Sequence, residues 1–363
     1  MNVKLDVAKS LPERGQARYM TSMTHDHDKA RAISYALLPK VSRSFALAIE
    51  ALPEPVRSYI CTSYLLCRIV DTIEDHPTLN DKPKYFDQFD RCLLEVEKDD
   101  ELDFSLLESM NPPQSWDAEL VTQSSVVFSL MSSYPEKARE ILKRNIHEMS
   151  VGMRDYTARG GHSAIELNDT ADLDRYCYYV AGTVGNLLTE IFAYHCGITD
   201  PEWIKRQKER GYHFAQGLQK VNIIKDVVAD FERGSVFMPR QWLTEFNVTR
   251  ADLINGTSKP EVQQLLRHFI RHTTDHLEKA RDYILAIPNN QKGLRLFCIW
   301  PYTMALDTLR LATSREGLFT SNHEIKVPRA QMFKMMALTK MLAPWSTPLR
   351  FYFNSKISDL RSK

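Results

Sequence analysis

The sequence predicts an all-α protein, and three observations support this class. Glycine is sparse, with 13 residues in a chain of 363. Turn signals are widely spaced, and apolar residues recur at intervals of three and four over long stretches, as on one face of a helix. The chain is 43% hydrophobic, which is enough for a substantial core. We expect a flexible N-terminal arm at residues 1–27, followed by a single all-α domain at residues 28–363.

The elements follow from apolar spacing and from prolines, which disfavour helix in the residue before them. Proline closes the first three helices at positions 39, 53 and 77. A connector or lid is expected at residues 235–242, after a glycine that ends the preceding helix. The expected helices are 28–38, 41–52, 55–76, 84–98, 116–132, 136–158, 173–196, 202–232, 259–287, 293–316 and 328–343, with a shorter one near the C-terminus.

Two of these helices carry a matched polar stripe. The stretch YLLCRIVDTIED places Tyr64, Arg68, Asp71 and Asp75 along one helical line. The stretch QKVNIIKDVVAD does the same with Gln219, Asn222, Asp226 and Asp230. Each pair of aspartates is four residues apart, about 6 Å along a helix axis. Both helices are otherwise apolar.

The stripes have two explanations. A solvated outer face is the usual one for an aspartate pair on a surface helix. Here apolar residues cover most of both helices, so the stripes are expected to face inward, where carboxylates need cations or donors. Mg²⁺ is a hard ion that binds through a few carboxylates plus substrate phosphates. Two clusters at equal spacing therefore predict a magnesium site.

Composition and targeting signals narrow the class further. A formal net charge of +1 gives no reason to expect nucleic-acid binding. The six cysteines form no CxxC pair and fit buried free thiols. The N-terminus lacks the apolar core of a signal peptide, and no apolar run approaches the roughly 20 residues of a membrane span. We expect a cytoplasmic protein, with the Met-rich segment 330–345 either a core helix or a surface in peripheral contact with a membrane.

Five segments resemble the squalene/phytoene synthase family, the trans-isoprenyl diphosphate head-to-head synthases. They are YLLCRIVDTIED, RYCYYVAGTVG, LQKVNIIKDVVADF, SRSFALAIEAL and LRLFCIWPYTMALDTL. The resemblance spans roughly residues 30–320 in the family's order, and it is greatest to the squalene-forming branch of bacterial type. It implies an isoprenoid-synthase fold with a central cavity between the two acidic helices. Two farnesyl diphosphates and Mg²⁺ would bind there.

The resemblance also implies roles for individual residues. The metal ligands would be Asp71, Asp75, Asn222, Asp226 and Asp230. Diphosphate and the polar ends of the substrates would meet Ser42, Arg43, Ser44, Arg68 and Gln219. Tyr176 matches a tyrosine near the reacting carbons. The hydrocarbon tunnel would be lined by Phe45, Val180, Ala181, Val184, Leu188, Phe297, Cys298 and Pro301. Catalysis itself would rest on Tyr176, Arg68, Asp71 and Asp75.

Two positions depart from the family pattern. Ala229 stands where an acid usually precedes the last aspartate of the second motif, and His76 follows Asp75 where a second aspartate is common. Both leave the aspartate pairs intact, so altered metal affinity is expected. Two single residues keep a structural alternative: Arg68 could pair with Asp71 or Glu74 on its own helix, and Tyr176 could be a hydrogen-bonded phenol in the cavity wall.

The implied chemistry suits these residue types. Diphosphate leaves only when its charge is neutralised, which Mg²⁺ and arginine supply. The carbocation that remains needs a dry cavity with aromatic faces. Condensation would give presqualene diphosphate, and hydride from NADPH would then give squalene. NADPH enters only through the resemblance, because no GxGxxG follows a strand. The alternatives are a dehydrosqualene or presqualene diphosphate synthase and, from another class, a non-catalytic scaffold protein. A monomer is expected.

Overall fold

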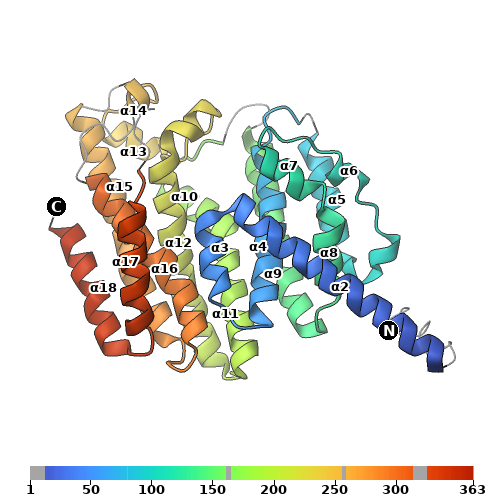
Figure 1. The fold of residues 1–363 in the computed structure, drawn as a ribbon. Helices are drawn as coiled ribbons and strands as arrows, with labels where there is room; N and C mark the ends of the chain where they lie inside the picture. The colour runs from blue at the N-terminus through green and yellow to red at the C-terminus, as the bar shows by residue number, and fades with distance from the viewer. Residues whose placement is uncertain (1–12, 80, 161–164, 256–258, 314–324, 363) are drawn as a thin grey trace. The chain divides into compact units, whose positions relative to one another are not determined.

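The fold is all-α, as predicted. The computed structural model describes residues 13–79, 81–160, 165–255, 259–313 and 325–362, without the side chains of residues 13–25, 43–44, 99–100, 160 and 255. This part of the chain contains no β-strand, only an isolated bridge between Glu166 and Val236. Its elements are α2 (Glu13–Val41), α3 (Arg43–Glu50), α4 (Val56–Asp75), α5 (Lys82–Leu94), η1 (Val96–Glu101), α6 (Ser105–Glu108), α7 (Ser115–Val121), α8 (Ser124–Ser132), α9 (Glu136–Gly160), α10 (Thr170–Cys177), η2 (Tyr178–Gly182), α11 (Thr183–Cys196), α12 (Pro201–Glu232), α13 (Arg240–Glu245), α14 (Asp252–Asn255), α15 (Pro260–Ala286), α16 (Lys292–Thr313), α17 (Arg329–Leu342) and α18 (Ser346–Arg361) (Figure 1).

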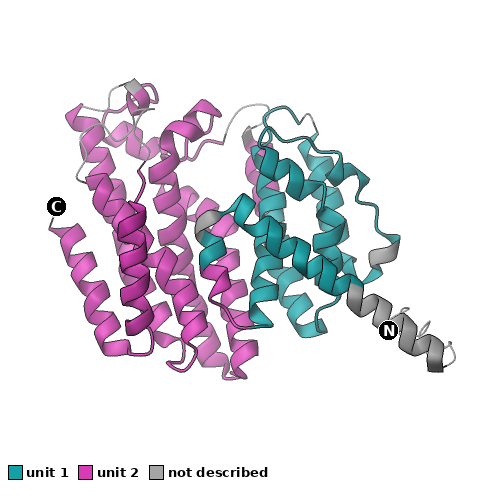
Figure 2. Ribbon diagram, in the orientation of Figure 1, with its two compact units in different colours: residues 1–47, 54–150 teal, residues 48–53, 151–363 magenta. Residues whose placement is uncertain are grey.

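The helices group into two compact units, drawn in teal and magenta in Figure 2. Unit 1 comprises residues 1–47 and 54–150, and unit 2 comprises residues 48–53 and 151–363. Helix α4 belongs to unit 1 and helix α12 to unit 2, so the two acidic stripes lie in different units. A single domain at residues 28–363, and a cavity between the two acidic helices, stay predictions.

Unit 1 is built around α4, which packs against α2, α5, α7 and α8. The apolar side chains that the periodicity assigned to the core of α4 are buried, and Leu65, Leu66, Ile69, Val70 and Ile73 are all 0% exposed. A helix with so wide an apolar surface must be covered on most sides. The residues left accessible on α4 include its polar stripe.

In unit 2 the long helices α12 and α15 make the most extensive contact, and α11, η2 and α16 also pack against α12. Helices α17 and α18 cover α16. Helices α11 and α12 approach closely where two glycines meet. A Cβ atom added at Gly185 would lie 2.8 Å from the backbone oxygen of Gly211. The absence of a side chain at Gly185 therefore allows the close packing of these two helices.

Four expected boundaries were wrong. Helix α2 runs past Pro39 to Val41, although this proline was expected to close it. Residues 13–27, expected as an irregular arm, are helical in α2, which fits their strong helix formers Glu13, Gln16 and Ala17. The helix expected at 116–132 divides into α7 and α8. Thr122 Oγ1 donates to the carbonyl of Glu119 and Ser124 Oγ to that of Val121, and such bonds compete with the helix at this point. Residues 178–182 form a π-helical turn inside the helix expected at 173–196.

The C-terminal helix α18 has 16 residues and is longer than expected. The cysteines are free, and all but Cys196 are buried, as predicted. None of the helices in the described ranges is long and apolar enough to cross a membrane. The cytoplasmic location, the contact with a membrane surface and the monomeric state stay predictions.

Candidate active site

Helix α4 presents the first predicted stripe with graded exposure. Tyr64, Arg68 and Asp71 are half-buried, and Asp75 at the end of the helix is exposed. Burial, together with the carboxylates of Asp75 and Asp117, raises the pKa of Asp71 to about 7 against the opposing effect of Arg68. Three carboxylates with one arginine carry an excess of negative charge. This is the environment in which a divalent cation would replace the proton on Asp71.

Arg68 is held by a residue that the sequence did not indicate. Its Nε and Nη2 atoms donate to the two carboxylate oxygens of Asp117 on α7, both at 2.9 Å. Asp117 is 4% exposed. The structural alternative paired Arg68 with an acid on its own helix. The acid that accepts its hydrogen bonds, Asp117, comes from another helix instead. The bidentate contact fixes the guanidinium plane beside Asp71 and leaves its remaining donors for a ligand.

Helix α3 contacts α4 at Tyr64, the N-terminal residue of the stripe. The ring of Phe45 packs at 5.6 Å from the ring of Tyr64. The backbone N–H of Phe45 donates to Ser42 Oγ at 3.3 Å, and Ser42 also hydrogen-bonds with Tyr64. Ser42 and Phe45 thus lie beside the stripe, and their contacts with substrate stay predictions. The side chains of Arg43 and Ser44 lie outside the described residues.

His76, the departure after Asp75, has a structural role. It is 7% exposed. Its Nδ1 accepts from the backbone N–H of Thr78 at 3.3 Å, so Nε2 carries the hydrogen and donates to the carbonyl of Asn111 at 3.1 Å. Both ring nitrogens are therefore used in hydrogen bonds with the backbone just after the end of α4. This residue therefore offers no free ligand atom to a metal.

Helix α12 presents the second stripe. Asn222 is exposed, Gln219 and Asp226 are half-buried, and Asp230 is 6% exposed. Lys225 Nζ lies 2.9 Å from Asp226 Oδ2, and Arg233 Nη2 lies 2.6 Å from Asp230 Oδ1. Ala229 is exposed, so the acid that the family pattern has there would stand in solvent. The two carboxylates with the amide oxygens of Asn222 and Gln219 are a hard-oxygen set that fits Mg²⁺.

Tyr176 on α10 lies in an aromatic cluster. It is 4% exposed and stacks on Phe237 at 4.8 Å, with the edge of Tyr156 at 5.2 Å. Phe237 also lines a small hollow of about 10 Å³ with Ile223, Val227 and Met238, and Asp230 is another of its lining residues. Tyr176 is therefore connected, through Phe237, to the acidic end of α12.

The predicted tunnel residues of unit 2 occupy three elements. Val180 and Ala181 lie in the π-turn η2, Val184 and Leu188 on α11, and the others on α16. Phe297 packs edge-on against Phe192 at 6.2 Å. π-Turns are frequent at functional sites because they shift side chains out of helical register. Leu188, Phe297 and Cys298 are buried, whereas Val180, Ala181, Val184 and Pro301 are half-exposed.

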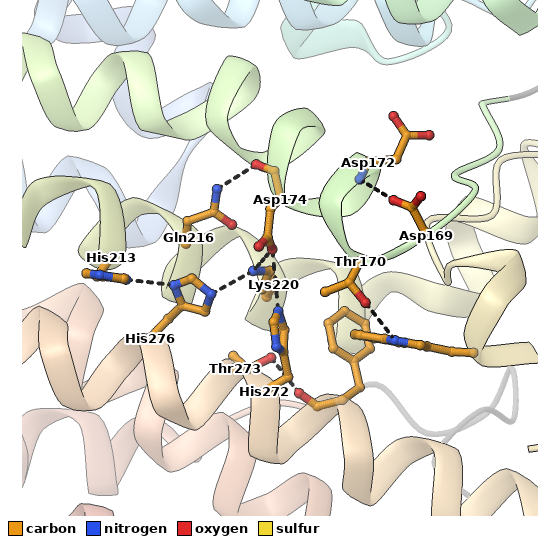
Figure 3. A network of polar contacts seen from close by, with 12 residues as sticks. Asp169, Thr170, Asp172, Asp174, His213, Gln216, Lys220, His272, Thr273 and His276 are labelled. Carbon is orange, nitrogen blue, oxygen red and sulfur yellow. Dashed lines mark hydrogen bonds and ion pairs between the residues drawn. The ribbon is translucent and has the colours of Figure 1, made fainter. Parts of the chain in front are cut away.

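One polar cluster near this site was missed from the sequence. Asp174, Lys220, His272 and His276 converge in unit 2 from α10, α12 and α15 (Figure 3). A signal was available, because Lys220 shares the apolar face of α12 with Ile223, Ile224 and Val227. A lysine on such a face predicts a buried acidic partner.

The comparison with protein families decides the identification. The model of the squalene/phytoene synthase family matches residues 38–331 of this chain. The chain belongs to this family.

Individual relatives agree with the family. A Botryococcus braunii protein named Botryococcus squalene synthase is 27% identical over 321 residues, which cover 85% of this chain and 63% of that protein. A solved complex of TcSQS with the ligand E5700 has a TM-score of 0.74 at 22% identity, covering 92% of this chain and 99% of the other. A dehydrosqualene synthase complex has a TM-score of 0.65 at 18% identity, covering 88% and 98%. The structures show a shared fold. The chain spans less than two thirds of the length of the first curated relatives it matches.

Proposed function

We propose that this squalene/phytoene synthase family member condenses two farnesyl diphosphates head to head into presqualene diphosphate and converts this intermediate to squalene with hydride from NADPH. The observation that carries the proposal is the pair of acidic stripes. Each sets two aspartates four residues apart on a helix that also carries a wide buried apolar surface, with Arg68 fixed beside one stripe. The names of the relatives, among them squalene synthases and a dehydrosqualene synthase, support the same substrate class.

The chain's own residues suit the ionisation of an allylic diphosphate. Asp71 and Asp75 in unit 1, and Asn222, Asp226 and Asp230 in unit 2, would hold Mg²⁺. Bound there, Mg²⁺ would neutralise diphosphate charge as a Lewis acid. Arg68 would donate to diphosphate oxygens, since Asp117 occupies only its Nε and Nη2. Mg²⁺ and Arg68 would both act where negative charge develops on the leaving group.

The aromatic cluster suits the carbocation stage. Tyr176, Tyr156 and Phe237 place three ring faces and edges in a largely buried region, which steadies positive charge and excludes water. The Tyr176 hydroxyl is proposed to pass on the proton whose loss closes the cyclopropane ring of presqualene diphosphate. Val180, Ala181, Val184 and Leu188, with the α16 residues, would contact the hydrocarbon chains.

The reductive step is proposed from the family alone. No cluster of the described residues is assigned here to NADPH, so no step is derived through it. The alternative activity, which stops at dehydrosqualene or presqualene diphosphate, differs only in this step. A non-catalytic scaffold is the second alternative, and the retention of both aspartate pairs speaks against it.

The test is a product assay with the full chain. Purified protein is incubated with farnesyl diphosphate and Mg²⁺, with and without NADPH, and products are identified by mass spectrometry. Squalene formed only with NADPH is the expected result. Presqualene diphosphate or dehydrosqualene in both reactions would assign the protein to the alternative activity and remove NADPH. No product in either reaction would favour the scaffold. Reactions with EDTA in place of Mg²⁺ are the matched control and are expected to give no product.

A further inference from the structure

A buried network of charged and polar side chains joins three helices of unit 2 (Figure 3). Lys220 on α12 is 0% exposed. Its Nζ lies 2.5 Å from Asp174 Oδ1 on α10 and 3.0 Å from His276 Nε2 on α15. His272 Nε2 lies 3.4 Å from the same Asp174 oxygen. His276 Nδ1 lies 3.0 Å from Nδ1 of His213, which extends the network along α12.

The hydrogen bonds fix the charge state of the network. A lysine ammonium only donates, so Nε2 of His276 accepts, and its Nδ1–H donates to His213. Both rings are therefore neutral in this arrangement. Burial, followed by the nearby Lys220 charge, lowers the pKa of His276 to about 3. Of Lys220, His276 and His213, only Lys220 thus carries a positive charge in this arrangement, and it faces the negative charge of Asp174.

The same residues resemble a metal site, and that alternative has to be weighed. Ligand atoms of Asp174, His272 and His276 lie within 4.8 Å of one another. Two histidines four apart on a helix with a carboxylate are a usual set for a transition metal. However, Lys220 Nζ is within hydrogen-bonding distance of two of these three ligand atoms. A cation held by the cluster would have to occupy that place, so the lysine is its resident cation.

The network holds two functional surfaces in place. On α10, Asp174 and Tyr176 are two residues apart, about 200° around the helix, so they face nearly opposite sides. Gln216 Nε2 also donates to the backbone oxygen of Asp174, at 2.7 Å. Gln216 and Lys220, four residues apart on α12, therefore bind α10 on the side away from Tyr176. These contacts limit how far Tyr176 can move relative to Phe237.

The network also restrains α12 itself. Gln216 and Lys220 lie on one face of this helix, and Asp226 and Asp230 lie roughly 100° around it from Lys220. A helix whose buried face is tied by ion pair and hydrogen bond cannot rotate about its axis without breaking that pair. The direction of the acidic stripe is thereby tied to the position of α10.

We propose that Lys220 is a positioning residue: as the resident cation of the Asp174–His272–His276 cluster it ties α12 to α10 and α15 and sets Tyr176 and the α12 acidic stripe in their working positions. The inference rests on the proposed function. It assigns no contact between Lys220 and substrate.

The test separates positioning from mere stability. Three variants are compared with wild type: Lys220→Met, Asp174→Asn/Lys220→Met, and Lys208→Met. Lys208 pairs with Glu190 on α11 from the same helix, far from the acidic stripe, and is the matched control. Lys220→Met removes the lysine partner of the half-buried Asp174 carboxylate and should lower Tm by about 5–10 °C. The double variant removes both charges and should recover most of that loss.

Turnover should not recover with stability. Lys220→Met and the double variant are both expected to lose about 100-fold in kcat, with KM for farnesyl diphosphate changed by less than about threefold. Lys208→Met should retain wild-type kcat. If the double variant regains both Tm and kcat, the network is only structural and the proposal is overturned. If Lys220→Met does not fold, the Tm and kcat of the double variant alone test the proposal.

Two outcomes keep this inference distinct from the proposed function. Wild-type protein that makes no product from farnesyl diphosphate contradicts the proposed function. The assignment of the resident cation is tested without activity, by titrating wild type and His272→Ala with Co²⁺ and recording visible absorption. No binding that depends on His272 is expected. Binding in wild type that His272→Ala abolishes would show a metal site and overturn the assignment of Lys220.

Discussion

The ionisation of Asp71 illustrates how a functional residue can be unfavourable to the fold. Burial first, and then Asp75 and Asp117, raise the pKa of this carboxyl to about 7, against the opposing effect of Arg68. A carboxyl whose folded pKa lies above its unfolded value stabilises the fold only while it is protonated. That contribution is present below the unfolded value, near 4, and is lost as the pH rises through about 7. At pH 8 without a metal, ionised Asp71 therefore destabilises the protein.

Replacing this carboxyl should separate activity from stability. Asp71→Asn and Asp226→Asn are expected to lower product formation from farnesyl diphosphate by about 1000-fold or more. Asp71→Asn should keep or raise Tm at pH 8 without Mg²⁺, because the amide imitates the protonated acid. Asp359→Asn, an exposed site on α18, is the control and should change neither quantity. Near-normal turnover in either variant would refute the metal-ligand assignment.

The Arg68–Asp117 contact allows a second comparison on a single helix. Asp117→Asn weakens a buried bidentate pair and should cost about 1.5–3 kcal/mol in the free energy of unfolding, measured by urea denaturation. Glu119 on the same helix pairs with Lys40, and both side chains are nearly half exposed. Glu119→Gln should therefore change stability by less than about 0.5 kcal/mol. Equal losses in the two variants would contradict the structural role given to Asp117.

At the residue scale, the sequence predicted those features that depend only on the spacing of residues within one helix. The stripes of α4 and α12 follow from residues three and four apart, and apart from Asp230 their side chains are at least partly accessible in the structure. Asp117 could not be predicted, because its partner Arg68 is 49 residues away and no local pattern joins them. The same holds for Asp174 and Lys220, which are 46 residues apart. Pairs between helices depend on packing that a single sequence does not encode locally.

At the element scale, the contact between α11 and α12 depends on having no side chain at one position. A Cβ at Gly185 would lie 2.8 Å from the Gly211 oxygen, and a backbone atom cannot move aside as a flexible side chain can. Alanine is about 1 kcal/mol better than glycine inside a helix. Overpacking by one methyl group in such a contact costs about 1–3 kcal/mol. The second effect should win here because both helices would have to separate.

Gly185→Ala is therefore expected to lower the free energy of unfolding by about 1–2 kcal/mol. The neighbouring Asn186→Ala, which adds no atom to the contact, should change it by less than about 0.5 kcal/mol. Urea denaturation followed by circular dichroism measures both. A Gly185→Ala protein as stable as wild type, or more stable, would show that α11 and α12 can separate without cost.

Helix boundaries were predictable at some prolines and glycines, as at the ends of α4 and α12, but not at Pro39, which lies inside α2. They were not predictable where short polar side chains compete with the helix, as between α7 and α8. The π-turn at 178–182 also had no marker, because its residues fit an ordinary helix equally well. It results from how α10 and α11 pack against α12, which periodicity does not describe.

At the scale of the whole molecule, the all-α class followed from composition and periodicity because both sum over many residues. The pH dependence of global stability, in contrast, depends on a few buried groups. His276 and His213 both have a lowered pKa, chiefly through burial, and then through Lys220 for His276 and Lys279 for His213. The unfolded chain takes up protons on these rings near pH 6.5, and the folded chain does not. Their contribution to stability is thus present above pH 6.5 and is lost as the pH falls below it.

The two histidines should therefore lower the free energy of unfolding as the pH falls from 7 to 5, by up to about 1.4 kcal/mol per pH unit each, while Asp71 contributes with the opposite sign over the same range. The slope for wild type is the sum of these contributions. Urea denaturation at half-unit steps measures this slope. His276→Gln should reduce the slope, although it lowers stability at pH 7 because Lys220 loses an acceptor. The control is His195→Gln, at a half-buried histidine outside the network. Its slope should differ from that of His276→Gln by as much as the wild-type slope does. A His276→Gln protein with an unchanged slope would show that the network takes up protons in the folded state, contrary to the neutral rings inferred from its hydrogen bonds.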